Sequence, residues 1–473
     1  MLLILCIDFV VVVSLIRASR RRLEDALPVF SFFLVLLPFE ARLVIPGLFD
    51  LTTDRIALLT LFVLFFVRRQ QTNRNPIPLK GLMLVHIGFA LCSTLFSLSI
   101  MTSTKLLVAQ VLEYYLLYYI FLRVITDVRT IYNIVYAMVI AMAICCTFGL
   151  FETYASWSIL RIFPSDLWVT YDNRHDPLYI EWGRGLRIRS TFPHPILFGD
   201  ALAMSIPLAL YLLSFWRQRW QRVMLWLSLP LMFWGVYKTS SRGPWIATGI
   251  ACVLLFFLIK TRVRKYLLAV ALLVSIALLA RPGIWTTIAN LYLQTQDTAS
   301  EVGASYQFRP ALNHAVIEAV SSQPGRALLG YGMGTFRELG LDINFLGEVN
   351  HWYTCDNNWA LFLYETGYGG LLIISILLLK PLLMTFQNYL RLPQPERYFS
   401  AVFFVMLAVF YFLLLSVAGY CWGQQGFMAW IVISLSVAYP GIVRRDRSAL
   451  RAASKGSRRD LNERSHEPAH GRC

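Results

Sequence analysis

Residues 131–151 read IYNIVYAMVIAMAICCTFGLF, an apolar run that contains no charged side chain. A transmembrane helix needs about 20 mostly apolar residues, so this run is long enough to cross a bilayer. Similar runs recur from Leu2 almost to Pro440. Of the 473 residues, 57% are hydrophobic and only 15% are charged, whereas about 25% are charged in soluble globular chains. The sequence therefore predicts a polytopic membrane protein and excludes a disordered chain, a fibre, a disulfide scaffold and a cytosolic enzyme.

Thirteen apolar runs are separated by short polar segments, and each predicts a membrane span. The spans are 1–16, 27–45, 55–67, 81–100, 106–122, 131–151, 196–215, 222–238, 244–259, 266–280, 359–379, 399–417 and 424–439. Basic residues test this assignment because Lys and Arg collect in cytoplasmic loops. Every basic cluster, from the one at 17–22 to the tail after Arg444, follows an odd-numbered span. This pattern predicts thirteen helices with the N-terminus outside, or twelve if the weak first span does not cross.

Two long loops fall on the predicted outer side, at about 152–195 and 281–358, the second between helices 10 and 11. We predict an all-α protein with five parts. They are the N-terminal helices with the first outer loop (1–195), the central helices (196–280), the large outer loop (281–358), the C-terminal helices (359–439) and a basic disordered tail (440–473). The tail is expected to lie against the anionic cytoplasmic leaflet. The net charge of +16 is explained by this topology, without nucleic acid as a partner.

The two outer loops contain several arginines and no lysine. Arg189 leads into the seventh span, Arg242 ends the TSSR stretch after the eighth, and Arg309 lies in the large loop. A guanidinium group is a planar fork that binds phosphate oxygens in pairs, which an ammonium group cannot do. This pattern favours a diphosphate site at the membrane surface. Alternatively, these side chains reach to the interface or pair with carboxylates such as Asp176 and Glu181.

A polar and aromatic cluster, HWYTCDNNW at 351–359, precedes the eleventh span. Aromatic faces and amides suit sugars, and the Asp356 carboxylate or the His351 imidazole could act as a general base. Taken alone, the cluster equally fits an interfacial aromatic belt with Asp356 or Asn357 capping a helix.

Other features of the sequence are weaker. Residues 311–320 have a helical apolar period, and the glycines at 330, 332 and 334 predict a turn but lack the ending of a nucleotide P-loop. The eight cysteines show no metal-ligand spacing, so no metal site is expected.

Together, four stretches resemble the superfamily of O-antigen ligases and O-antigen polymerases. They are Arg189–Pro195 with Phe198-Gly199, Ser240–Gly243, Arg309 with Pro324 and the run Gly330–Phe336, and Asp356-Asn357 with Glu365–Gly367 and Gly370-Leu371. The resemblance covers about 189–371. Position 356 holds aspartate where ligases usually have histidine, and in this respect the chain resembles polymerase-like members more closely.

The resemblance implies a GT-C-like inverting glycosyltransferase of the bacterial inner membrane with its active site facing the periplasm. Its donor would be a polyprenyl-diphosphate-linked glycan, its acceptor a glycan or a lipid, with a chain-length regulator as a further partner and no cofactor. It implies that Arg189, Arg242 and Arg309 bind the diphosphate and that Asp356 or His351 acts on the acceptor. His194, Asn357 and Glu365 would support them.

Three other functions stay open on the sequence alone. A ligase would transfer the finished glycan to a lipid or protein, and a transporter would move lipid-linked glycan across the bilayer. Transporters usually bind substrate near the midplane, whereas the polar chemistry here lies on the outer loops. The third alternative is a membrane scaffold without enzymatic activity.

Overall fold

The computed structural model describes residues 1–465 except 46–49, 70–75, 169–175, 182–184, 216–217, most of 281–300 and residue 422. The helices are α1 (Leu2–Ala18), α2 (Ala26–Leu36), α3 (Thr53–Val67), α4 (Lys80–Leu95), α5 (Ile100–Gln110), α6 (Leu117–Val124), α7 (Val128–Tyr154), α8 (Pro195–Phe215), α9 (Arg219–Lys238), α10 (Arg242–Leu258), α11 (Arg262–Ala280), α13 (Glu301–Ser321), α14 (Pro324–Leu329), α15 (Thr335–Leu339), α16 (Asn358–Arg391), α17 (Glu396–Leu413) and α18 (Gly423–Ser465). A π-helical stretch, Val111–Leu116, joins α5 to α6.

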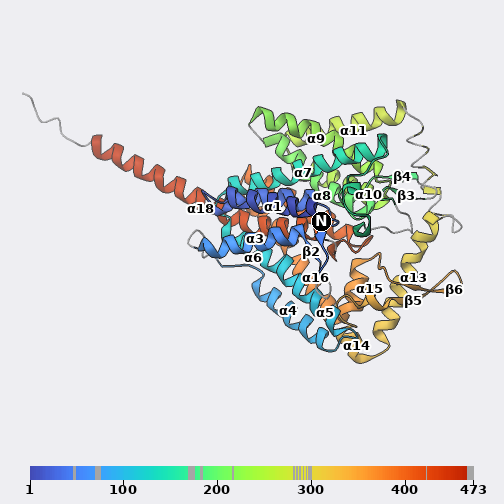
Figure 1. Cartoon of the computed structure of the whole chain (residues 1–473). Coiled ribbons are helices and arrows are strands. Elements are labelled where there is room, and N and C mark those ends of the chain that lie inside the picture. Colours follow the sequence, from blue (N-terminus) through green and yellow to red (C-terminus); the bar gives the residue numbers. More distant parts are fainter. Residues whose placement is uncertain are drawn as a thin grey trace, which may run out of the picture.

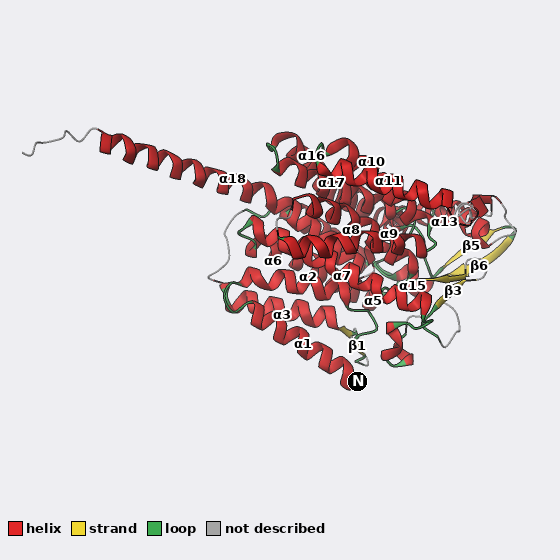
Figure 2. Ribbon diagram, turned by 90° about the horizontal axis from the view of Figure 1, so that it is seen from above, coloured by secondary structure: helices red, strands yellow, loops and turns green. Residues whose placement is uncertain are grey.

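The described strands form three antiparallel two-stranded hairpins. They are β1 (Arg42–Leu43) with β2 (Leu51–Thr52), β3 (Tyr179–Glu181) with β4 (Gly185–Arg187), and β5 (Leu341–Phe345) with β6 (Glu348–Trp352). The long helices run side by side, and these strands gather toward one end of the bundle, whereas α18 projects beyond the other end (Figure 1). Figure 2 shows the same separation from above.

We call the end with the strands the hairpin end; it comprises the described parts of 37–52, 96–99, 155–194, 239–241, 301–357 and 414–422. Hydrogen bonds link several of these segments, as when Leu98 N–H donates to the carbonyl of Tyr331 at 3.1 Å. Each of these segments contains or adjoins a connection between spans that the sequence predicts on one and the same side of the membrane, although the sequence predicts 96–99 and parts of 37–52 and 414–422 inside spans.

Within the described residues, six helices are long and apolar enough to cross a membrane. They are Ile100–Val124, Val128–Tyr154, Pro195–Phe215, Asn358–Arg391, Glu396–Leu413 and Gly423–Ser448. The protein is therefore mostly helical and multi-pass, as the sequence predicts. Each of the other predicted spans also overlaps a helix. Helix α8 is the most enclosed of the six and packs against α7, α9, α10 and α17.

Helix α2 is shorter than its predicted span of 27–45, because it ends at Leu36. Leu37 is extended, with ψ 135°, as expected for a residue that precedes a proline. The amide of Gln424 on α18 donates to the carbonyls of Val35 at 3.1 Å and Leu37 at 2.8 Å. These bonds satisfy carbonyl groups at the end of α2, where the helix no longer supplies donors.

Helix α18 also differs from the prediction, because it continues through Pro440 to Ser465, where the sequence predicts a disordered tail. The added part is rich in alanine and arginine, which are good helix formers. Proline is tolerated inside a membrane helix when neighbouring groups satisfy the freed backbone. Residues 466–473 of the predicted tail lie outside the described residues.

The large loop folds onto the hairpin end with a small core of its own. Its first part, 281–300, lies mostly outside the described residues. The amphipathic period at 311–320 is confirmed as part of α13, which buries Leu312, Val316 and Val320. These side chains meet Phe336 from α15 and Leu361 from α16. The loop is thus attached to the first turns of α16 by apolar packing.

Candidate functional site

Arg242 is the first residue of α10 and is half-buried. The turn before it is held by Arg187, a buried residue of β4. Arg187 Nε donates to the carbonyl of Thr239 at 2.9 Å, and Nη2 donates to Ser241 Oγ at 2.7 Å. The same guanidinium also pairs with Glu181. The long segment between α7 and α8 therefore fixes the point at which Arg242 begins α10.

Two glycines let three elements meet beside Arg242. A Cβ atom on Gly199 of α8 would lie 2.7 Å from Cγ of Pro244. A Cβ atom on Gly243 would lie 3.1 Å from Oγ of Ser416, in the segment after α17. Any side chain at Gly199 would clash, so glycine permits this close approach. The second turn of α8, the start of α10 and the end of α17 therefore lie in contact.

Arg309 on α13 joins the same place from the large loop. Its Nη2 donates to the carbonyl of Ser416 at 3.1 Å. Its guanidinium is close enough to interact electrostatically with the carboxyl groups of Asp200 on α8 and Asp356 before α16. We call Asp200, Arg242, Arg309, Asp356 and Ser416 the arginine–aspartate cluster.

Asp356 is a half-buried carboxyl group directly before α16. Burial raises the pKa of its carboxyl above the ordinary value of an aspartate, and the nearby Arg309 guanidinium opposes that rise. A carboxylate with a raised pKa is a stronger base than an exposed one, and it can accept a proton from a sugar hydroxyl. The cluster thus combines a base with guanidinium groups suited to phosphate.

Asn357 positions this aspartate. Its Oδ1 accepts from the backbone N–H groups of Trp359 at 3.0 Å and Ala360 at 3.4 Å, so it is the N-cap of α16. Its Nδ2 donates to Oδ1 of Asn313 on α13 at 3.1 Å. Asn357 therefore ties the start of α16 to the helix that carries Arg309.

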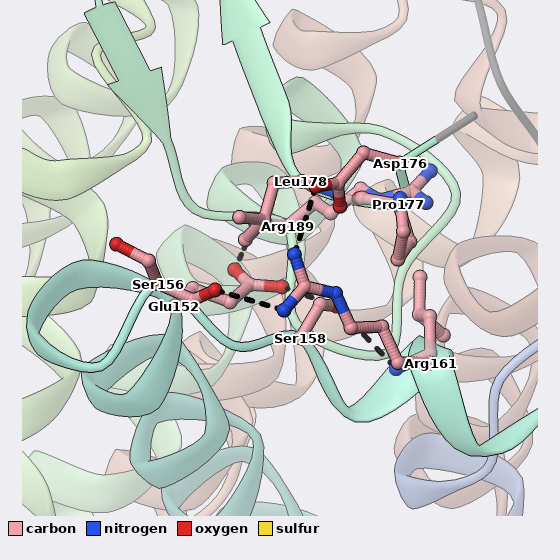
Figure 3. A network of polar contacts seen from close by, with 9 residues as sticks. Glu152, Ser156, Ser158, Arg161, Asp176, Pro177, Leu178 and Arg189 are labelled. Atoms are coloured by element: carbon pink, nitrogen blue, oxygen red, sulfur yellow. Dashed lines mark hydrogen bonds and ion pairs between the residues drawn. The ribbon is translucent and has the colours of Figure 1, made fainter. Parts of the chain in front are cut away.

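Arg189 lies in a separate polar network (Figure 3). Its side chain is buried and donates from Nε to the carbonyl of Pro177 at 2.9 Å and from Nη1 to that of Pro193 at 3.0 Å. Its backbone N–H donates to Glu152 Oε2 at 2.9 Å, and Ser158 donates to the other oxygen of that carboxylate at 3.0 Å. This network shapes the loop that enters α8, and the predicted binding of a diphosphate by Arg189 stays a prediction.

His194 also belongs to this entry loop. Its Nδ1 accepts from the backbone N–H of Ile196 at 3.1 Å, so the neutral ring carries its proton on Nε2, which lies 3.1 Å from the hydroxyl of Tyr179. These contacts cap the start of α8 and connect it to β3.

Glu365 contacts the glycine run of the large loop. Its Oε1 accepts from Gly334 N–H at 2.7 Å, and its carbonyl accepts from Gly332 N–H at 2.9 Å. The glycines at 330, 332 and 334 all have positive φ and form the predicted turn. Two residues after Glu365, Gly367 interrupts α16 with φ 65° and ψ −174°. Glu365 thereby fastens the turn to the part of α16 that precedes Gly367.

His351 lies on the exposed β5–β6 hairpin. Its Nδ1 is 2.6 Å from Oδ1 of Asp342, and its Nε2 is 2.8 Å from the carbonyl of Leu339. These two bonds raise the pKa of His351, and the bond to Asp342 contributes most. Since both ring nitrogens face acceptors, the protonated ring is favoured and has no lone pair left for a substrate proton.

The sequence reasoning did not identify Asp200 and Glu152 as site residues. Asp200 is fully buried in α8, and Glu152 is buried at the end of α7. The sequence could have indicated them, because a carboxylate inside a membrane span is energetically costly and is usually functional. Each of these residues is a single charge in or beside an apolar run, so it forms no motif. Among the described residues, no group of three or more His, Cys, Asp or Glu side chains could hold a metal ion.

Replacing Arg187 with methionine is expected to destabilise the fold by about 2–3 kcal/mol, because a buried ion pair and two hydrogen bonds to the α9–α10 turn are lost. The matched control is Arg161→Met in the same outer loop, where the pair with Asp176 at 2.8 Å is exposed. Surface pairs contribute about 0–1 kcal/mol. Thermal unfolding of the purified Arg187→Met and Arg161→Met proteins measures the loss of stability in each. An equal loss in the two variants would contradict this role of Arg187.

Comparison with known families identifies part of the chain. Residues 227–375, from α9 to α16, match the family model described as O-antigen ligase. This family contains ligases and polymerases and is a family of enzymes. The matched segment includes Arg242, Arg309 and Asp356 of the cluster. No curated protein matches the chain.

Proposed function

Because residues 227–375 form a domain of the O-antigen ligase family, we propose that this membrane protein is an inverting glycosyltransferase of the bacterial inner membrane. It polymerises glycan repeat units that are linked to polyprenyl diphosphate, building O-antigen or exopolysaccharide on the periplasmic side. The membrane holds donor and acceptor in one plane, which lowers the entropic cost of bringing them together.

The observation that supports this proposal most is the meeting of two arginines and one aspartate at the hairpin end. Arg242 begins α10, Arg309 comes from α13 and Asp356 precedes α16. Gly243, which follows Arg242 in the chain, packs against Ser416, and the carbonyl of Ser416 accepts from Arg309, so the backbone at Arg242 lies near Arg309. Guanidinium groups at the membrane surface can bind the diphosphate of the lipid-linked donor. The transfer reaction also needs a base near the hydroxyl of the acceptor.

In the proposed reaction, Asp356 takes the proton of the acceptor hydroxyl while the hydroxyl oxygen attacks the anomeric carbon of the donor sugar. The bond from that carbon to the diphosphate oxygen breaks, and polyprenyl diphosphate leaves with the electron pair. Arg242 and Arg309 stabilise the charge on the departing diphosphate. Attack opposite the leaving group inverts the anomeric carbon.

The remaining predicted residues take supporting roles in this proposal. Asn357 orients Asp356, Glu365 anchors the glycine turn, and His194 caps α8. Arg189 shapes the entry to α8 in the proposed arrangement, and its predicted contact with a diphosphate is left to mutagenesis. His351 is the weaker alternative for the base because Asp342 and Leu339 occupy both of its nitrogens.

A ligase is the second candidate, and the description of the matching family as O-antigen ligase favours it. Two features support a polymerase instead: the Asp356-Asn357 pair resembles polymerase-like members, and His351 faces protein acceptors. The two enzymes would share the donor and differ in the acceptor, which is a second repeat unit for a polymerase and a lipid or protein for a ligase.

The test is an assay of the protein in lipid nanodiscs with a synthetic polyprenyl-diphosphate-linked repeat unit. A ladder of lengthened products supports the polymerase, and a single transfer that requires an added lipid acceptor supports the ligase. In vesicles, movement of intact donor between leaflets without a new glycosidic bond would identify a transporter and refute the proposal.

The rate of transfer is expected to fall on acidification, because only the deprotonated form of Asp356 accepts a proton. Burial raises the pKa of Asp356 and Arg309 opposes the rise, so activity is lost at a higher pH than for an ordinary aspartate. Arg309→Gln removes the opposing charge, so the loss of activity on acidification should begin at a still higher pH. The other titratable groups nearby are Asp200, Cys355 and Glu365. Initial rates of the wild type and of Arg309→Gln, measured across a range of pH, give the size of the shift. Identical pH profiles of the two proteins would contradict this prediction.

A further inference from the structure

An open groove lies between α1, α2 and α7. Its volume is about 550 Å³, within the range of about 300–1,000 Å³ that is usual for small-molecule sites. Most of the side chains that line it are apolar, among them Phe32 and Phe33 of α2 and Ala137 and Ile140 of α7. An apolar groove on the side of a membrane bundle is suited to a hydrocarbon chain.

The groove begins at the end of the bundle opposite the hairpin end. Helix α1 starts at the hairpin end, where Ile4 packs against Ala41 and Leu160 (Figure 2). Arg17, in the last turn of α1, therefore lies at the opposite end and lines the groove there. Ile140 lies twelve residues after the start of α7, or roughly 18 Å along the helix. The groove thus runs from the level of the lipid headgroups into the apolar layer.

Two polar groups of α1 line the same groove. Ser14 and Arg17 are three residues apart and share one face of the helix. Among the described residues, no side chain or backbone group forms a hydrogen bond or an ion pair with the Ser14 hydroxyl or the Arg17 guanidinium. Arg20 and Arg21 follow in the next turn and are exposed. The end of the groove therefore carries positive charge that the described protein groups do not neutralise.

We propose that this groove binds one anionic phospholipid, with an acyl chain along Phe32 and Phe33 and the phosphate against Arg17 and Ser14. Charge complementarity identifies the headgroup, because basic pockets between membrane helices bind anionic lipids and a guanidinium forms strong bonds to phosphate. The bound chain would fill the space between α1 and α7 and so attach α1 to the bundle. This inference does not depend on the proposed function, whose donor is assigned to the hairpin end.

The experiment is native mass spectrometry of the detergent-purified protein with added phosphatidylglycerol or phosphatidylcholine of the same acyl chains. We expect the wild type to retain one phosphatidylglycerol with a preference of about fivefold over phosphatidylcholine. Arg17→Gln should lose this preference. The matched control is Arg129→Gln, which removes an exposed arginine at the start of α7 that does not line the groove. It should bind both lipids as the wild type does.

A second variant separates a groove from a simple attraction to the headgroup layer. Arginines near helix ends often reach to that layer without binding one lipid. Ala137→Phe fills the groove and leaves every charge in place, so it should weaken the binding of both lipids. If it keeps the full preference of the wild type for phosphatidylglycerol, the groove is not the site and the proposal is wrong. Should Ala137→Phe not fold, Ser14→Leu fills the groove from α1 and replaces it.

Thermal unfolding gives an independent readout, because a ligand that binds only the folded protein raises the Tm. Phosphatidylglycerol should raise the Tm of the wild type and of Arg129→Gln more than that of Arg17→Gln or Ala137→Phe. Equal binding of the two phospholipids, or unchanged binding in Arg17→Gln, would overturn the proposal. Polyprenyl phosphate is the competitor: if it displaces phosphatidylglycerol from the wild type, the groove belongs to the carrier lipid and the phospholipid assignment fails.

Discussion

Replacing Asp356 with asparagine is expected to lower the rate of glycan transfer by about 10²–10⁴-fold, the range that a general base contributes. Asparagine has nearly the same shape but cannot accept the proton of the acceptor hydroxyl. Binding of the donor should change little, because the diphosphate is assigned to Arg242 and Arg309. The measurement is kcat and KM for the lipid-linked repeat unit, with the loss expected in kcat.

The control for Asp356→Asn is Glu348→Gln, which changes a carboxylate on the exposed β6 strand of the same loop. It should leave both kinetic constants near those of the wild type. Equal melting temperatures for the two variants would show that the hairpin end is intact. If Asp356→Asn keeps full activity, Asp356 is not the base, and His351→Gln would become the decisive variant.

Arg242→Lys is expected to reduce transfer by about 10–100-fold and to shorten the polymer made in cells. Lysine keeps the positive charge at the start of α10 but loses the planar fork that contacts two phosphate oxygens at once. The loss of one charge-assisted contact to a diphosphate corresponds to about 1.5–3 kcal/mol. Kinetics with the purified protein and the length of the glycan in a complemented strain both measure the effect.

Arg262→Lys is the matched control, because Arg262 is also the first residue of its helix but starts α11, at the end of the bundle opposite α10's start. It should not affect the glycan. A near-normal polymer from Arg242→Lys at a normal protein level would refute the role of Arg242. A parallel loss in Arg309→Lys would support a diphosphate shared between the two arginines.

Most of the helical fold could be predicted because membrane spans are long apolar runs with basic residues on one side. The exception at α2 has a local cause. Pro38 and the donor Gln424, which lies far away in the chain, end the helix at Leu36 although apolar residues continue. Proline could have revealed the break, but the partner on α18 could not be read from the sequence.

The candidate site was predictable in part. Arginine without lysine on the outer loops singled out Arg242 and Arg309, and the structure brings Arg309 beside Asp356. The Arg189 guanidinium donates to the backbone carbonyls of Pro177 and Pro193, and a motif in the sequence does not reveal whether a guanidinium binds a ligand or its own backbone. Asp200 was missed for a related reason: its hydrogen-bond partner Gln425 lies on α18, and only the packing of distant helices brings the two together.

The interruption at Gly367 divides α16 into a short first segment, 358–366, at the hairpin end and a long second segment. The first segment is hydrogen-bonded to the glycine turn at 331–334. That turn is hydrogen-bonded to Leu98, between α4 and α5, and to Ser103 on α5. Asp356 directly precedes the first of these two segments, which is held by Asn313 of α13 and by the glycine turn. The position of Asp356 is therefore set by contacts with the large loop and is uncoupled from the direction of the long second segment.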